Sequence, residues 1–135
     1  ARFGDPETQV VLPRLITPLS ELLLAAASGN LGSQPRPEFT DDVAVAVVLA
    51  SEGYPDEPLT GRSIYGLDKV VDVTVAHAAT ALVNGRYRTT GGRVLSVVAT
   101  GGTFAEARSR VYAALDTIQL EGGHYRTDIA LRVSE

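Results

Sequence analysis

The sequence predicts an α+β fold: a small, strongly bent antiparallel sheet, half-barrel or sandwich-like, with a packed C-terminal helix and an N-terminal linker helix. Three observations support this class. Short valine-rich runs separated by Gly, Pro and Asn turns fill residues 43–99, a pattern typical of small antiparallel sheets. Apolar residues then recur with a helical period at 104–118, and a shorter helical pattern precedes the sheet at 19–27. At 135 residues the chain is long enough to bury its own core.

The first residues predict a turn followed by a short helix. Gly4 permits a tight turn, and Pro6 suits the first position of a helix that Pro13 kinks or ends. Because Pro6 keeps its predecessor out of the α region, Asp5 is expected to be the N-cap. Its carboxylate would then accept a hydrogen bond from the amide of residue 7 or 8.

A second helix is expected after Thr17-Pro18, with Thr17 as N-cap and Pro18 at the first helical position. Gly29 or Asn30 would close it as a C-terminal cap. The stretch 32–40 holds two prolines and is expected to be an extended connection between subdomains. The apolar residues of this helix share one face: Leu19, Leu22, Leu23, Ala26 and Ala27.

The valine content of residues 43–49 predicts the first strand and, for it, a central position in the sheet. Residues 51–62 are rich in Pro, Gly and acids, and so predict a long surface loop of the kind that carries binding groups. Further strands are expected at 64–65, 70–76 and 94–99, with turns at Asn84-Gly85 and 89–92.

Thr103 and Glu106 form a capping box, which predicts a helix that runs through Ile118. Gly122-Gly123 ends the region, and the alternating pattern of 124–133 suggests a final strand. The apolar residues of the helix recur on one face and predict that it lies on the sheet: Phe104, Ala107, Val111, Leu115 and Ile118.

Composition restricts the partners and the setting. A formal charge of -4 argues against nucleic acid or an anionic membrane surface as the main partner. The longest apolar run, 43–50, is too short to span a bilayer. The chain contains no cysteine, which excludes disulfides and thiolate metal sites and fits a cytoplasmic setting. It also opens inside a motif, so we expect it to be part of a larger protein.

The sequence contains few residue patterns that indicate a catalytic, metal or nucleotide site. His77 and His124 have no second nitrogen or sulfur ligand nearby, so no metal site is expected in this chain. The glycines before Thr103 lie where a helix N-terminus attracts anions, although a plain strand-to-helix turn is the favoured interpretation. Gly91-Gly92-Arg93 is compatible both with a ligand contact and with a hairpin whose arginine is solvated. No P-loop, dinucleotide fingerprint or nucleophile elbow is present.

Residues 2–9, Arg-Phe-Gly-Asp-Pro-Glu-Thr-Gln, resemble the signature of the phosphoribosylamine-glycine ligase family, also called glycinamide ribonucleotide synthetase, of the ATP-grasp superfamily. Further stretches resemble the C-terminal landmarks of that family in the same order: Gly53-Tyr54-Pro55, Thr60-Gly61, Ile64 with Gly66-Leu67, 77–80, 91–95 and 126–129. The resemblance covers the whole chain but only about the last third of the family's enzyme. It implies that residues 1–16 end the ATP-grasp domain, 17–40 form a linker helix and loop, and 41–135 form the C-terminal domain.

The resemblance further implies an ATP-dependent ligase that joins glycine to 5-phosphoribosylamine through a glycyl phosphate in de novo purine biosynthesis. The products would be glycinamide ribonucleotide, ADP and phosphate. ATP and magnesium (or manganese) would be bound mainly by parts of the enzyme before Ala1, because the family's Glu and Asn metal ligands precede the Arg of the motif. The partner of this chain would be the remainder of the ligase, and the chain alone is expected to be inactive.

Within this chain, the resemblance implies catalytic roles for Arg2 and Asp5. Its substrate-binding residues would be Glu7, Gly53, Tyr54, Pro55, Gly92 and Arg93. Two positions depart from the family pattern. Ala79 stands where the family usually has Gly, and the aromatic residue that the family usually has near Pro58 is missing. Two alternatives stay open, namely the C-terminal domain of another ATP-grasp carboxylate-amine ligase and a non-catalytic binding module.

Overall fold

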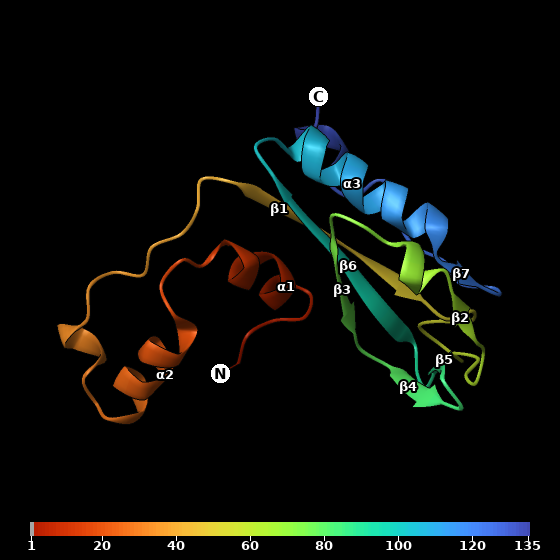
Figure 1. Cartoon of the computed structure of the whole chain (residues 1–135), viewed down its shortest axis with the longest axis horizontal. Helices are drawn as coiled ribbons and strands as arrows, with labels where there is room; N and C mark the ends of the chain where they lie inside the picture. The colour runs from red at the N-terminus through yellow and green to blue at the C-terminus, as the bar shows by residue number, and fades with distance from the viewer. Residues whose placement is uncertain (1) are drawn as a thin grey trace.

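A computed structural model describes residues 2–135 and confirms the α+β class, with small antiparallel sheets that do not close into a barrel (Figure 1). The helices and strands are, in order, α1 (Glu7–Val11), α2 (Leu19–Ala27), β1 (Val43–Ala50), β2 (Ile64–Tyr65), β3 (Thr74–His77), β4 (Thr80–Val83), β5 (Arg86–Thr89), β6 (Arg93–Gly101), α3 (Phe104–Thr117) and β7 (Gln119–Leu120). Short 3-10 turns lie at 12–14, 31–33, 67–69 and 131–133.

The main sheet has the order β1-β6-β3, with both neighbours antiparallel to β6. The expectation that residues 43–49 form the central strand is therefore wrong, because β6 occupies that place. Valine content did not distinguish the two strands. In β1 fully buried residues alternate with half-buried ones from Ala44 to Leu49, whereas Val94–Ala99 of β6 are buried without interruption, as expected for a strand covered on both faces.

Helix α3 covers one face of the sheet along β1 and β6 (Figure 1). The predicted capping box is present: Thr103 Oγ1 accepts from the amide of Glu106 at 3.2 Å, and Glu106 Oε2 accepts from the amide of Gly102 at 2.9 Å. The residues that α3 buries are Ala107, Val111, Ala114 and Leu115. Phe104 does not belong to this face, since it is 37% exposed at the first helical position.

Two predicted strands differ from the structure. The strand expected at 70–76 is confined to β3, because Asp72 has a φ of 58°, in the left-handed region that a strand does not tolerate. The tail 124–133 forms no strand either: His124 makes a single bridge to Ala50, and the chain then turns through Ala130. The turn at Asn84-Gly85 is confirmed as the connection of the β4–β5 hairpin, with positive φ at both residues.

The N-terminal cap is also different from the prediction. The N-cap of α1 is Pro6, which makes no side-chain capping bond, and the carboxylate of Asp5 accepts instead from Gln9 Nε2 at 3.3 Å. The turn is held by Thr8, whose hydroxyl donates to the carbonyl of Gly4 at 2.7 Å. Pro13 ends α1 as predicted, within a 3-10 turn.

Helix α2 starts one residue later than predicted, because Thr17 Oγ1 accepts from the amide of Glu38 at 2.8 Å and not from the helix. Its end is as predicted. Gly29 has a φ of 73°, and the amide of Asn30 reaches the carbonyl of Ala25 at 2.8 Å, the pattern of a Schellman cap.

The core lies between α3 and the main sheet. Its fully buried members come from β1, β6 and α3, and the largest are Val47, Val94, Leu95, Val97, Val111 and Leu115. Among residues 2–135, no helix is long and apolar enough to cross a membrane.

Candidate functional site

An ion pair connects the first turn of the chain to the main sheet. Arg93, the first residue of β6, places Nη2 3.0 Å from Asp5 Oδ2, and its Nη1 donates to the carbonyl of Asp5 at 3.4 Å. About two fifths of each side chain remains exposed, so solvent reaches the pair. Of the predicted residues, Asp5 and Arg93 are thus brought together directly.

The loop after β1 is fastened to the turn before β6. Ser51 is buried, its amide donates to the carbonyl of Gly92 at 2.8 Å, and its hydroxyl donates to the carbonyl of Gly91 at 2.8 Å. The ring of Tyr54 then lies against Gly92, where a Cβ would overlap it. Glycine at position 92 is therefore required by this close approach.

Gly53 and Pro55 act through the backbone of the same loop. Gly53 has a φ of 82°, and its carbonyl accepts from the amide of Glu57 at 2.9 Å, which closes a tight turn. Pro55 is exposed on the outside of this turn. These two residues hold Tyr54 in place, and neither lines a cavity with it.

The C-terminal segment 124–129 forms the opposite wall, and α3 holds it. Arg108 donates from Nε to the carbonyl of Ile129 at 3.0 Å and from Nη2 to the carbonyl of Thr127 at 2.7 Å. The hydroxyl of Tyr112 donates to the carbonyl of Arg126 at 2.7 Å and accepts from the amide of Ile129 at 3.2 Å. We call these four hydrogen bonds the α3 clamp.

A cleft of about 260 Å³ lies between these parts. Segments far apart in the sequence line it: the start of α1, the strand β1, the Tyr54 loop, the start of β6 and the clamped tail. Its floor is apolar. The polar and aromatic side chains that line it are Tyr54, Arg93, His124, Tyr125 and Arg126.

The lining of this cleft suits ligand binding more than catalysis. An apolar floor with cationic groups is typical of a site for a small ligand that carries a negative charge. The volume lies below the roughly 300–1,000 Å³ of complete ligand pockets. The cleft therefore has the character of one side of a larger site.

The charged groups of the tail have partners. Arg126 donates to both oxygens of Asp128, at 2.9 and 2.7 Å, and these hydrogen bonds hold the pKa of the Asp128 carboxyl below its usual value. Burial raises the pKa of Tyr125, and the nearby Asp116 carboxylate, which accepts from the Tyr125 hydroxyl at 3.3 Å, raises it further. Tyr125 thus links the cleft to α3.

Of the predicted residues, Tyr54 and Arg93 line this cleft, and the others do not: Arg2, Asp5, Glu7, Gly53, Pro55 and Gly92. Arg2 is exposed. Within residues 2–135, its guanidinium donates one hydrogen bond, to the carbonyl of Phe3 at 3.1 Å. Glu7 is exposed in the first turn of α1, where its carboxylate folds over Gly4.

The other features that the sequence singled out have structural explanations. At the turn before α3, Glu106 accepts from the amide of Gly102 and Thr103 accepts from the amide of Glu106, as in a strand-to-helix turn closed by a capping box. His77 Nδ1 lies 2.9 Å from Thr80 Oγ1, and its ring lies against Tyr87. Within residues 2–135, no three His, Asp or Glu side chains gather as a metal site would need.

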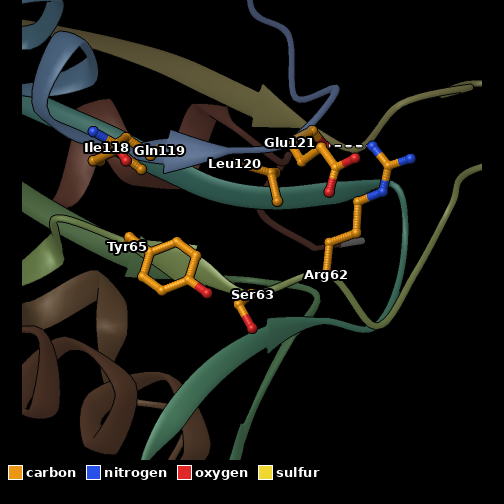
Figure 2. Close-up of a pocket in the computed structure, with 7 residues that line it drawn as sticks. All are labelled: Arg62, Ser63, Tyr65, Ile118, Gln119, Leu120 and Glu121. Carbon is orange, nitrogen blue, oxygen red and sulfur yellow. Dashed lines mark hydrogen bonds between the residues drawn. The ribbon is translucent and has the colours of Figure 1, made fainter.

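A wider hollow of about 630 Å³ lies where β2 meets β7 (Figure 2). Figure 2 shows Arg62 reaching Glu121, whose carbonyl accepts from Nη1, and Arg62 also pairs with Glu52. None of the predicted residues lines this hollow. We therefore place the candidate site in the smaller cleft.

His124, Tyr125 and Arg126 were not predicted as site residues. The alternating pattern of 124–133 predicts a final strand, whereas the structure folds these residues against the outer edge of β1. A signal was present, because 126–129 is among the stretches that resemble family landmarks. An arginine in such a stretch, outside regular structure, is a reasonable site candidate.

The fold and the cleft together define a small α+β domain with an open cleft lined by two arginines. The family model described as "Phosphoribosylglycinamide synthetase, C domain" matches residues 44–132, and the chain belongs to this family. The resemblance found in the sequence is thereby confirmed.

Curated relatives carry a matching name. The phosphoribosylamine–glycine ligase of Leifsonia xyli is 64% identical over 137 residues, which cover 98% of this chain and 33% of the relative. The ligase of the same name from Caulobacter vibrioides is 51% identical, over 98% of this chain and 32% of the relative. The chain thus spans about a third of the length of these relatives.

A solved structure agrees in fold. The crystal structure of phosphoribosylamine–glycine ligase from Thermotoga maritima superposes with a TM-score of 0.78 at 35% identity. The match covers 95% of this chain and 31% of the Thermotoga chain. The similarity therefore extends over the N-terminal residues as well as the sheet.

Proposed function

We propose that this chain is the C-terminal part of an ATP-dependent ligase that joins glycine to 5-phosphoribosylamine in de novo purine biosynthesis, in the cytoplasm. One observation carries the proposal. This chain belongs to the phosphoribosylglycinamide synthetase C-domain family, and 98% of its length aligns with the phosphoribosylamine–glycine ligase of Leifsonia xyli. The reaction would pass through a glycyl phosphate and give glycinamide ribonucleotide, ADP and phosphate.

In this proposal residues 1–16 end the ATP-grasp domain, 17–40 connect it to the next domain, and 41–135 form the C-terminal domain. The start of the family match at residue 44, one residue into β1, supports the last boundary. The cleft would then face the ATP-grasp domain, which would supply its missing side. The small volume and open form of the cleft support this placement.

Among the site residues, Arg93 would contact an anionic group of the substrate, with Asp5 holding the guanidinium in place. The Gly53-Tyr54-Pro55 turn, pressed on Gly92, would form one wall. Arg2, exposed before α1, and Glu7, exposed in its first turn, would complete the site from the ATP-grasp side, with Arg2 next to the phosphoryl group that is transferred. Clustered positive charge and exclusion of water are what an acyl phosphate intermediate requires.

The metal ion that such a ligase needs does not fit the side chains of this chain. Carboxylates would have to gather to hold magnesium, and none do so among residues 2–135. We therefore assign ATP and magnesium (or manganese) to the part of the ligase outside this chain.

The proposal is tested by phosphate release from ATP by the complete ligase, with glycine and phosphoribosylamine added together and singly. Release that requires both substrates is the expected result. Release with a different acid or amine would assign the domain to another ligase of the superfamily. The 135-residue chain alone should release no phosphate under the same conditions.

A further inference from the structure

Arg126 lines the cleft, and the proposed function gives it no role. It belongs to the wall formed by 124–129, and it is one of two arginines in the lining, the other being Arg93. Each of them pairs with a carboxylate, Arg93 with Asp5 and Arg126 with Asp128. Among residues 2–135, no Asp or Glu lines the cleft. The lining thus carries both cations without the carboxylates that hold them.

The guanidinium of Arg126 is held along one edge and open along the other. Nε donates to Asp128 Oδ1 at 2.9 Å, and Nη2 donates to Asp128 Oδ2 at 2.7 Å. This bidentate pair fixes the plane of the guanidinium. Within residues 2–135, Nη1 has no acceptor for its N–H donors. Because the side chain is 72% exposed, these donors can reach a ligand.

Helix α3 and strand β1 fix the backbone that carries Arg126. The α3 clamp attaches the carbonyl of Arg126 to Tyr112, and residues 127 and 129 to Tyr112 and Arg108. The guanidinium carbon of Arg108 lies 4.5 Å from the centre of the Tyr112 ring, so the two clamp residues also support each other. On the other side, His124 exchanges backbone hydrogen bonds of 2.8 and 3.0 Å with Ala50. A loop fastened in this way to rigid elements suits a binding residue.

Of the substrates in the proposed reaction, the sugar phosphate suits this pair of arginines best. The phosphate of phosphoribosylamine carries a charge of about −1.5 to −2 at pH 7 and three acceptor oxygens, whereas glycine offers a single carboxylate. Two guanidiniums match the phosphate in charge, and each can bind its oxygens in pairs. The apolar floor and the ring of Tyr54 leave a surface against which the sugar can pack.

We propose that Arg126 binds the phosphate of phosphoribosylamine together with Arg93, and that Tyr112 and Arg108 are positioning residues that hold Arg126 through the α3 clamp. This inference rests on the proposed function, because it takes its ligand from that reaction. It also explains the stretch 126–129 as a unit. Its arginine contacts the ligand, its aspartate orients the guanidinium, and α3 holds its backbone.

Two ligands that differ only in the phosphate test the contact. Glycinamide ribonucleotide keeps the phosphate and glycinamide riboside lacks it. Binding of the first to the complete ligase is measured by calorimetry, and binding of the second by its displacement of the first. We expect Arg126→Ala to weaken binding of the ribonucleotide by about tenfold or more, because charge-assisted hydrogen bonds are lost, and to leave binding of the riboside unchanged.

The matched control is Arg132→Ala, which removes an exposed arginine of the same tail outside the cleft. This variant should bind both ligands as the unsubstituted ligase does. The KM for glycine should also stay unchanged in Arg126→Ala, because the arginine is assigned to the other substrate.

Tyr112→Phe tests the positioning role. Alone, it should weaken binding of the ribonucleotide by about two- to tenfold, since Arg126 is then held less firmly. In a ligase that already carries Arg126→Ala, it should have no further effect, because the residue through which Tyr112 acts is gone. A merely structural role for Tyr112 would weaken binding in both backgrounds.

Equal affinity of the ribonucleotide for Arg126→Ala and for the unsubstituted ligase would overturn the assignment of Arg126. A loss of riboside binding as large as that of the ribonucleotide would do the same. Further weakening by Tyr112→Phe in the Arg126→Ala background would overturn the positioning role. Failure of the proposed function is distinct, since the unsubstituted ligase would then bind neither ligand, and this inference would fall with it.

Discussion

Arg93 and Asp5, 88 residues apart in the sequence, meet in an ion pair that ties the first turn of the chain to the start of β6. The pair replaces the N-cap role expected of Asp5, because a carboxylate that faces a guanidinium is more strongly stabilised than one that faces a single amide. It also presents Arg93 at the edge of the cleft.

The first prediction concerns this pair. Asp5→Ala and Arg93→Ala, alone and combined in the 135-residue chain, should give a coupling of about 0.2–1 kcal/mol, the range of exposed ion pairs. Urea unfolding measures it. In the complete ligase, Arg93→Ala should lower the rate by about tenfold or more, because a guanidinium that binds an anionic group of the substrate contributes more than a surface ion pair. Lys69→Ala is the control, and an unchanged rate for Arg93→Ala would remove Arg93 from the site.

The second prediction concerns the contact between Gly92 and Tyr54. Gly92→Ala places a Cβ that overlaps the edge of the Tyr54 ring and lies 3.1 Å from Pro58, so the loop has to move. We expect a loss of about 1–3 kcal/mol, as for other overpacked positions. Gly32→Ala, with open space around its Cβ, is the matched control and should change stability little. Equal stabilities of the two variants would contradict the packing described for the loop.

The third prediction concerns the α3 clamp. Tyr112→Phe removes the hydroxyl that joins the carbonyl of Arg126 and the amide of Ile129, and it should cost about 0.5–1.5 kcal/mol. Amide exchange in 124–129 should become faster, while exchange in β6 stays unchanged. Tyr65→Phe serves as control, since the structure gives the Tyr65 hydroxyl no hydrogen bond within residues 2–135. Unchanged exchange in 124–129 would show that the clamp does not hold the tail.

The fourth prediction concerns pH. Burial and the Asp116 carboxylate raise the pKa of Tyr125 from its ordinary value of 10.0. A raised pKa in the folded state means that the stabilisation is complete below about pH 10 and is lost as the pH rises through the folded pKa. Asp116→Asn should move the titration of Tyr125 back toward 10.0, measured as the difference in tyrosinate absorbance against Tyr125→Phe. No movement would exclude Asp116 as a cause.

The parts of the fold that local chemistry determines were predictable. The capping box of Thr103 and Glu106, the Asn84-Gly85 turn and the glycine end of α2 are each decided within a few residues. The order of strands was not predictable in this way, because β1 and β6 are both rich in valine. What separates them is which elements cover their faces, and that depends on the tertiary fold.

The candidate site also contains residues that the sequence indicated and residues that it did not. Asp5, Tyr54, Gly92 and Arg93 were named from family resemblance, and the structure brings them together around one cleft. Arg126 was not named, because its position depends on hydrogen bonds from α3 that no local pattern reveals. The functional roles of these residues, and those of Arg2 and Glu7, remain predictions.

The most direct test of the central claim is to incubate the complete ligase with ATP, phosphoribosylamine and isotopically labelled glycine and to look for the labelled product by mass spectrometry. The same experiment is run on a ligase from which residues 41–135 have been removed. We predict labelled glycinamide ribonucleotide from the complete ligase and none from the shortened one. Undiminished product from the shortened ligase, or no product from the complete one, would contradict the assignment of this chain to that reaction.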